Sequence, residues 1–128
     1  METILIVDDE KNYPPILAAV MEEEGFEPLM ANSGEEDMNI LKHSDVDLVL
    51  TDMKMPSMDG MEVLRSVKRT NPATEVIILT GHGHEEDRQL CMQLGAFAYL
   101  QKPLDINVLS ETIQKANEKI RRKKGKKD

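Results

Sequence analysis

Residues 4–10 read ILIVDDE, four consecutive aliphatic residues followed at once by three acids. Such a run, without alternation of polar and apolar residues, is typical of a strand buried on both faces, as in a parallel sheet. Three further runs share this pattern, at residues 48–50, 76–79 and 97–100. A weaker run at 29–31 follows Pro28. Because proline at the first strand position is tolerated at a sheet edge, this run predicts an edge strand.

Helical patterns alternate with the apolar runs. Ser33 and Glu36 form a capping-box pattern, and Gly25 and Gly95 stand where left-handed helix ends are expected. The predicted helical stretches are 16–21, 33–43, 63–67, 90–94 and 109–120. The last has an apolar stripe at 109, 113, 116 and 120, which is the clearest helical spacing in the chain. Strict strand–helix alternation over 128 residues predicts one α/β domain, a parallel sheet with helices on both faces.

Charge is distributed unevenly along the chain. Residues 115–128 contain eight Lys or Arg and two acids, a net charge of +6, so the remainder carries −14 of the total of −8. An acidic body does not by itself attract nucleic acid. We interpret the basic stretch as the solvated end of the last helix, with an anionic partner as the alternative.

Two classes of protein are excluded by patterning. No apolar run approaches the ~20 residues of a membrane-spanning helix, and the first residues resemble no secretory signal. The only cysteine, Cys91, rules out an intrachain disulfide, which fits a reducing cytoplasm. We therefore expect a cytoplasmic protein.

The residues that end the predicted strands are acids, a hydroxyl and a lysine. In a doubly wound sheet, ligands bind outside the carboxyl ends of the strands. In chain order, the residues at these ends are Asp8, Asp9 and Glu10, then Asp52, then Thr80, then Lys102. Since parallel strands lie ~4.8 Å apart, these side chains are expected to share one rim.

Like charges gathered at one rim repel each other, and a divalent cation relieves the repulsion. Mg2+ prefers such oxygen ligands. A carboxylate beside this ion and Lys102 is a reasonable phosphoryl acceptor, and Thr80 could donate a hydrogen bond to the acyl phosphate. The structural alternatives are ordinary: Asp8 and Asp9 can cap the next helix, Asp52 and Thr80 can lie in turns, and Lys102 can be a surface lysine.

The chain resembles the receiver domain of bacterial two-component response regulators over residues 3–120. The pattern rests on the acids at 8–10, the string TDMKMPSMDG at 51–60, LTG at 79–81 and GAFAYLQKP at 95–103. The run LTGHG at 79–83 is most similar to receivers of nitrogen-regulatory-type transcriptional activators.

The resemblance implies a role for each matching residue. Asp52 would be the phosphoacceptor, Lys102 would pair with the phosphoryl group, and Thr80 would move to hydrogen-bond it. Tyr99 would turn inward as the switch aromatic. The implied Mg2+ ligands are Asp8, Asp9, Asp52 and the backbone carbonyl of Lys54. It also implies a cis Lys102–Pro103 peptide and the flavodoxin-like strand order 2-1-3-4-5.

The implied function is that of a phosphoaspartate switch. A sensor histidine kinase or phosphotransfer protein would donate the phosphoryl group, and the face of the fourth helix, fifth strand and fifth helix would control an output protein or a fused output domain. Candidate residues of that face are Glu85, Glu86, Arg88 and Gln89. We expect no turnover of an external substrate, no membrane contact, and no direct nucleic-acid binding; a homodimer is possible.

We expect a receiver domain at 1–120, a basic C-terminal tail at 121–128, and a stand-alone regulator rather than an excised receiver. The alternatives are an aspartyl phosphatase, an interaction module that takes no phosphate, and nucleic-acid binding through the tail. A phosphatase needs a second acid two residues after the nucleophile, and Lys54 occupies that position. His82 and His84 could form a metal pair, although two histidines near glycines more often face solvent.

Overall fold

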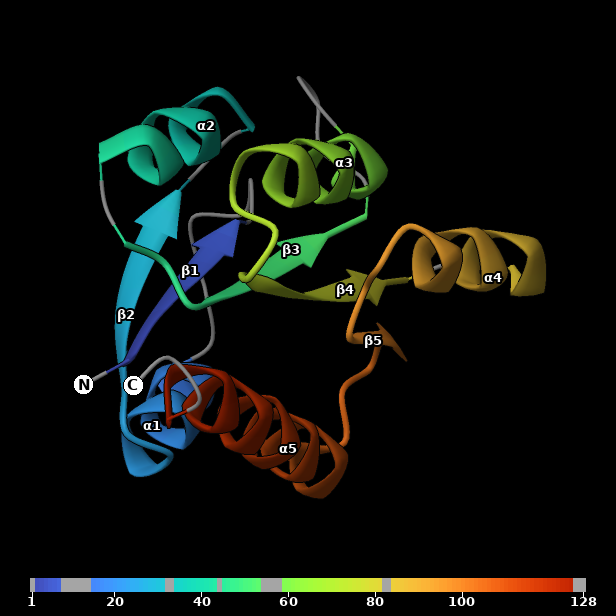
Figure 1. Ribbon diagram of the computed structural model, residues 1–128. Helices are drawn as coiled ribbons and strands as arrows, with labels where there is room; N and C mark the ends of the chain where they lie inside the picture. The colour runs from blue at the N-terminus through green and yellow to red at the C-terminus, as the bar shows by residue number, and fades with distance from the viewer. Residues whose placement is uncertain are drawn as a thin grey trace.

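In a computed structural model of the chain, residues 2–7, 15–31, 34–43, 45–53, 59–81 and 84–125 are described. Strands and helices alternate throughout (Figure 1). In chain order, they are β1 (Glu2–Val7), α1 (Pro15–Glu23), β2 (Phe26–Ala31), α2 (Gly34–His43), β3 (Leu48–Asp52), α3 (Gly60–Thr70), β4 (Glu75–Thr80), α4 (Glu85–Gln93), β5 (Ala98–Gln101) and α5 (Ile106–Gly125).

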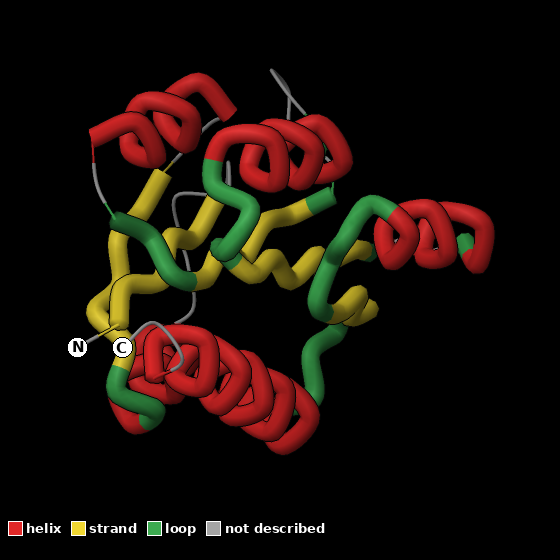
Figure 2. The backbone as a smooth tube through the Cα atoms, viewed as in Figure 1, coloured by secondary structure: helices red, strands yellow, loops and turns green. Residues whose placement is uncertain are grey.

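The five strands form one parallel sheet in the order β2-β1-β3-β4-β5. This confirms the α/β fold, the parallel sheet and the implied strand order. The helices lie on both faces of the sheet: α1 and α5 cover one, and α2 and α3 cover the other (Figure 2). Among the described helices, none is both long enough and apolar enough to cross a membrane.

Alternate residues of each strand face two separate hydrophobic cores. Ile4 and Ile6 of β1 pack on the side of α1 and α5, whereas Leu5 and Val7 pack on the side of α2 and α3. Strand β4, which lies between β3 and β5, is buried along its whole length. A strand buried on both faces is apolar along most of its length, as residues 76–79 of β4 are, which is why continuous runs, rather than alternating ones, predicted this sheet.

The weakest predicted strand has different bounds. β2 begins at Phe26, so Pro28 is its third residue rather than its first. β2 is nevertheless at the edge, with β1 as its single neighbour. Proline has no backbone N–H to donate to a neighbouring strand. Because an edge strand is hydrogen-bonded on one side only, it can contain Pro28 where an interior strand would lose a hydrogen bond.

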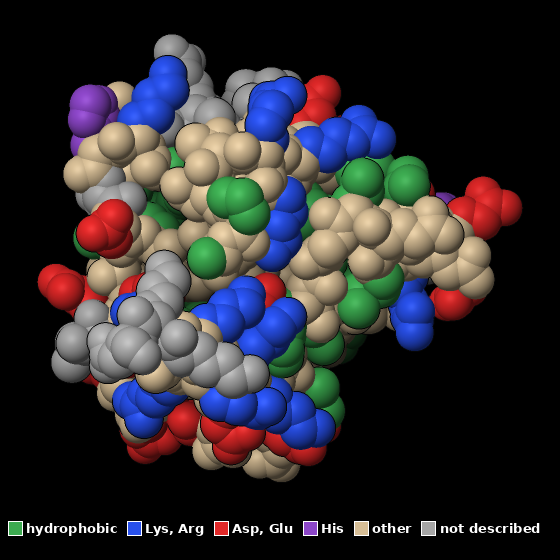
Figure 3. Space-filling view, in the orientation of Figure 1, with side chains coloured by type: hydrophobic (Ala, Val, Ile, Leu, Met, Phe, Trp, Pro, Cys, Tyr) green, Lys and Arg blue, Asp and Glu red, His purple; other side chains and the backbone are tan. Residues whose placement is uncertain are grey.

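The last helix is longer than the predicted stretch at 109–120. Its apolar stripe is buried as expected, but α5 starts at Ile106, where Asp105 accepts hydrogen bonds from the N–H groups of Asn107 and Val108. It continues to Gly125, so residues 121–125 of the expected tail are helical. Lys and Arg side chains gather over α5 and between α5 and α3 (Figure 3).

In α4, the predicted apolar positions are only partly buried. Of these positions, Cys91 is fully buried, Leu94 is half-buried and Leu90 is 37% exposed. Met92, which was not among them, is 40% exposed. α4 therefore packs on the sheet through a narrow contact and presents apolar side chains outward.

Candidate functional site

The described site residues lie at the carboxyl edge of the sheet. Asp52 is the last residue of β3 and Thr80 is the last residue of β4. In the register of the sheet, Asp52 pairs with Leu79, and Thr80 pairs with Gln101, the residue before Lys102. The carboxylate of Asp52, the hydroxyl of Thr80 and the ammonium group of Lys102 thus lie at the ends of three neighbouring strands, on the same rim.

Asp52 and Lys102 are in direct contact across 50 positions of sequence. The Lys102 ammonium donates to Asp52 Oδ2 at 3.2 Å. The side chain of Asp52 is 14% exposed and that of Lys102 is 32% exposed. A carboxylate that is partly buried, reachable from solvent and held beside a cation is suited to accept an electrophile whose charge the lysine can balance.

The loop after β5 places Lys102. Its backbone N–H donates to Thr80 O at 2.7 Å, and the peptide bond between Lys102 and Pro103 is cis, as the resemblance implied. The strand-end backbone of β4 therefore fixes where the chain of Lys102 leaves the sheet.

Gly60 is a supporting residue that the site prediction did not single out. Its N–H donates to Met53 O at 2.7 Å. A Cβ on Gly60 would lie 2.7 Å from Asp52 O and 2.9 Å from Met53 Cα, closer than real Cβ atoms approach other atoms. The start of α3 is thus packed directly on the backbone of Asp52. The Asp-Gly pair at 59–60 was the available signal, since Asp59 caps α3 by accepting from Glu62 N at 2.8 Å.

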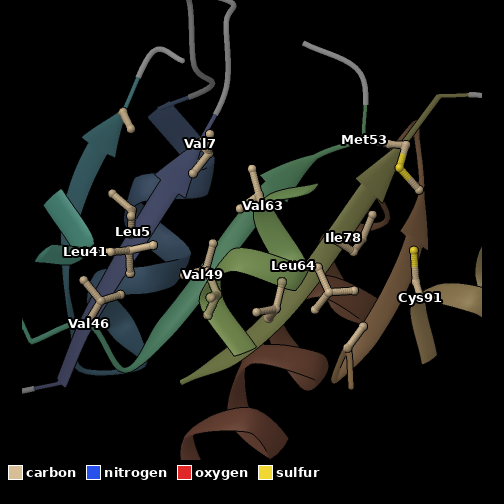
Figure 4. Packing of buried hydrophobic residues seen from close by; sticks show 14 residues of the cluster. Leu5, Val7, Leu41, Val46, Val49, Met53, Val63, Leu64, Ile78 and Cys91 are labelled. Carbon is tan, nitrogen blue, oxygen red and sulfur yellow. The ribbon is translucent and has the colours of Figure 1, made fainter. Parts of the chain in front are cut away.

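Apolar packing beneath the rim holds α3 in this place. Val63 and Leu64 of α3 belong to the same core as Val49 and Ile78 of the sheet, and Met53 lies at the end of β3 (Figure 4). The carboxyl end of β3 is therefore fixed by its own core as well as by Gly60.

Thr80 and Tyr99 lie on neighbouring strands. Tyr99 pairs with Ile78, so it is diagonal to Thr80 on the same face of the sheet. Burial raises the pKa of Tyr99, and the nearby Thr80 hydroxyl acts in the opposite direction. The Tyr99 hydroxyl is buried without a hydrogen bond of normal geometry among the described residues.

The other predicted metal ligands, Asp8, Asp9 and Lys54, lie outside the described residues, as does His82. Within the described ranges, no three His, Cys, Asp or Glu side chains gather as a cation site. Asp52 fits one part of a Mg2+ ligand set, because it offers a partly exposed carboxylate at the rim where the remaining acids are predicted.

Comparison with known proteins gives a consistent result. A model of the response regulator receiver domain matches residues 4–114. Sporulation initiation phosphotransferase F of Bacillus subtilis is 37% identical over 114 residues, covering 89% of this chain and 92% of that protein. The structure of the receiver domain of NtrC4 from Aquifex aeolicus has 32% sequence identity and a TM-score of 0.79, and covers 93% of this chain and 98% of that one.

Longer proteins are also similar. The transcriptional regulatory protein GlrR of Escherichia coli K12 is 36% identical over 115 residues, which cover 90% of this chain and 26% of GlrR. The chain thus spans about a quarter of the length of this and other curated relatives that it matches.

Proposed function

This chain belongs to the response regulator receiver domain family, and on that premise we propose that it is a phosphoaspartate switch whose acceptor is Asp52. The observation that carries the proposal is the contact of Lys102 with Asp52 at 3.2 Å, at the rim where Thr80 also ends its strand. A histidine kinase or phosphotransfer protein is the proposed donor.

In the proposed reaction, a carboxylate oxygen of Asp52 forms a bond to the phosphorus of the donor. The bond from phosphorus to the donor's leaving atom breaks, and that atom keeps the electron pair. Lys102 balances the charge on the phosphoryl oxygens, and the Thr80 hydroxyl donates a hydrogen bond to one of them.

Mg2+ is part of the proposal. Asp8, Asp9, Asp52 and the backbone carbonyl of Lys54 would hold it, and the bound ion would neutralise part of the phosphoryl charge. The chain supplies the remaining positive charge through Lys102. We propose no turnover of an external substrate, since the position two residues after Asp52 is Lys54 and offers no second carboxyl group.

The proposed output is a shift between two conformations. A phosphoryl group would draw Thr80 toward the rim, which frees space for Tyr99 to turn inward, and the phosphorylated form would stabilise that arrangement through contacts absent from the other. The surface of α4, β5 and α5 would then meet an output partner, with Glu85, Glu86, Arg88 and Gln89 of α4 as candidate contacts. A cytoplasmic location and homodimerisation remain predictions.

The test is the intact mass of the protein after incubation with acetyl phosphate and Mg2+. We expect wild type to gain the mass of one phosphoryl group and Asp52→Asn to gain none. Asp59→Asn is the matched control, because it removes a nearby acid while keeping a residue that caps α3 equally well. A folded wild type that gains no mass, or an Asp52→Asn variant that gains as much as wild type, would contradict the proposal.

A further inference from the structure

The amino edge of the sheet, opposite the site, contains a buried carboxylate. Glu75 begins β4, and its side chain is only 1% exposed. Burying an isolated charge costs free energy, and ion pairs with three lysines offset that cost for Glu75. Lys119 and Lys123 lie 2.9 and 3.2 Å from Oε2, and Lys68 lies 3.5 Å from Oε1.

These lysines come from opposite faces of the sheet. Lys68 belongs to α3, whereas Lys119 and Lys123 are one helical turn apart on α5. Burial acts to raise the pKa of Glu75, but the combined hydrogen bonds and charges of the lysines outweigh it and lower the pKa overall. The charged form of Glu75 therefore links α3 and α5 at the amino ends of the strands.

Other basic residues of α5 also face acids of this chain. Lys124 lies 3.0 Å from Asp47, and Arg121 lies 3.7 Å from Glu2. Asp47 in turn accepts from the Thr3 N–H at 2.8 Å. The acidic partners of Lys119, Arg121, Lys123 and Lys124 thus stand at the amino ends of the strands or just before them.

Lys119 connects this edge to the strand of Tyr99. Its ammonium lies 5.7 Å from the centre of the Phe97 ring, just before β5. The Phe97 N–H donates to Val76 O at 2.7 Å, beside Glu75. The same lysine therefore contacts β4 and the approach to β5.

Close packing supplies only part of this docking. Ala116 and Ile120 are buried, but a cleft of about 860 Å³ opens beside the last turn of α5. Its lining includes Asp47, Thr74, Ile120, Lys123 and Lys124. Across this cleft, Lys124 contacts Asp47 and Lys123 contacts Glu75, so charged contacts hold the helix beside the opening.

We infer that residues 115–125 form an electrostatic strap, which docks on the amino edge of the sheet with Glu75 as its anchor. The four lysines of residues 115–125 contact acids of this chain, so this described part of the basic stretch acts within the molecule. The strap fixes the direction in which α5 ends. The inference depends on no phosphorylation step.

Hydrogen exchange of wild type and Glu75→Gln tests the inference. We expect exchange within 115–125 to rise roughly tenfold or more in the variant, as for the loss of a charge-assisted hydrogen bond, while β1 and β3 keep their protection. Glu111→Gln is the control, because it removes an exposed partner of Lys115 within α5 and leaves the anchor in place. We expect Glu111→Gln to match wild type.

The double variant Lys119→Gln/Lys123→Gln removes the two α5 lysines that contact Glu75, and both side chains are exposed. It should raise hydrogen exchange in residues 115–125 as well. This variant decides the matter if Glu75→Gln does not fold. Unchanged exchange in 115–125, or an equal rise across the whole sheet, would overturn the strap.

Discussion

Gly60 is the residue whose substitution should report most directly on the geometry at Asp52. In Gly60→Ala, the added Cβ meets backbone atoms of Asp52 and Met53 that have little freedom to move. The overpacking costs about 1–3 kcal/mol. This exceeds the gain of up to ~1 kcal/mol from replacing glycine in a helix. We expect a net loss of stability in urea unfolding and a slower gain of phosphoryl mass.

Gly81→Ala provides the comparison, because a Cβ there has no heavy atom within 4 Å. Its unfolding free energy should stay within about 0.5 kcal/mol of wild type. If Gly60→Ala were as stable as Gly81→Ala, the close approach of α3 to the acceptor strand would not be a constraint.

Elements differ in how far their sequences determine them. The stripe of α5 predicted its buried face, since Leu109 and Ile113 follow the helical period. Its C-terminal extent was not predicted, because it depends on pairs such as Lys123 with Glu75, 48 positions apart. Local patterns carry no information on such partners. The start of β2 was missed for a related reason: Pro28 breaks the apolar run, but pairing with β1 continues through it.

The contact between β4 and α5 should make stability depend on acid pH. The pKa of Glu75 is lowered in the folded protein, so its ionisation favours folding above the ordinary value near 4.5. This contribution is lost as the pH falls through the lowered pKa. The charged groups that face Glu75 are Lys68 of α3 and Lys119 and Lys123 of α5.

We therefore expect the stability difference between wild type and Glu75→Gln to be largest near neutral pH and to shrink below pH 4.5. Urea unfolding from pH 7 to pH 3 measures it. A difference that stays constant over that range would mean that the charge of Glu75 contributes nothing to the fold.

At the scale of the whole molecule, the sheet explains why much of the site was predictable. Continuous apolar runs and strict alternation with helices predicted a parallel sheet, whereas the strand order was implied by the family resemblance. Parallel strands bring their carboxyl ends to one rim. Asp52, Thr80 and Lys102 were expected there on that ground, and the structure places all three at that rim. Asp8, Asp9 and Lys54 lie outside the described residues, so their predicted place at the rim stays a prediction.

The proposed switch extends from Asp52 to the surface of α4 and β5. A substitution between these two places should therefore separate phosphorylation of Asp52 from the response of Tyr99. Thr80→Ala keeps the acceptor and Lys102 but removes the hydroxyl next to Tyr99. We expect this variant to gain phosphoryl mass yet to lose most of the response of Tyr99. The chain has no tryptophan and two tyrosines, Tyr13 and Tyr99. In a Tyr13→Phe background, Tyr99 is therefore the one tyrosine that contributes to the near-ultraviolet circular dichroism.

Thr80→Ser is the conservative comparison, because it keeps a hydroxyl and should retain the phosphorylation-dependent change in the Tyr99 signal. If Thr80→Ala instead showed the full change on phosphorylation, Tyr99 would respond to Asp52 by another route. If it failed to gain mass at all, Thr80 would act in the transfer itself. The role proposed for Thr80 is supported only if Thr80→Ala gains phosphoryl mass while the circular dichroism signal of Tyr99 stays unchanged. Thr80 would then be the residue that couples phosphorylation of Asp52 to Tyr99.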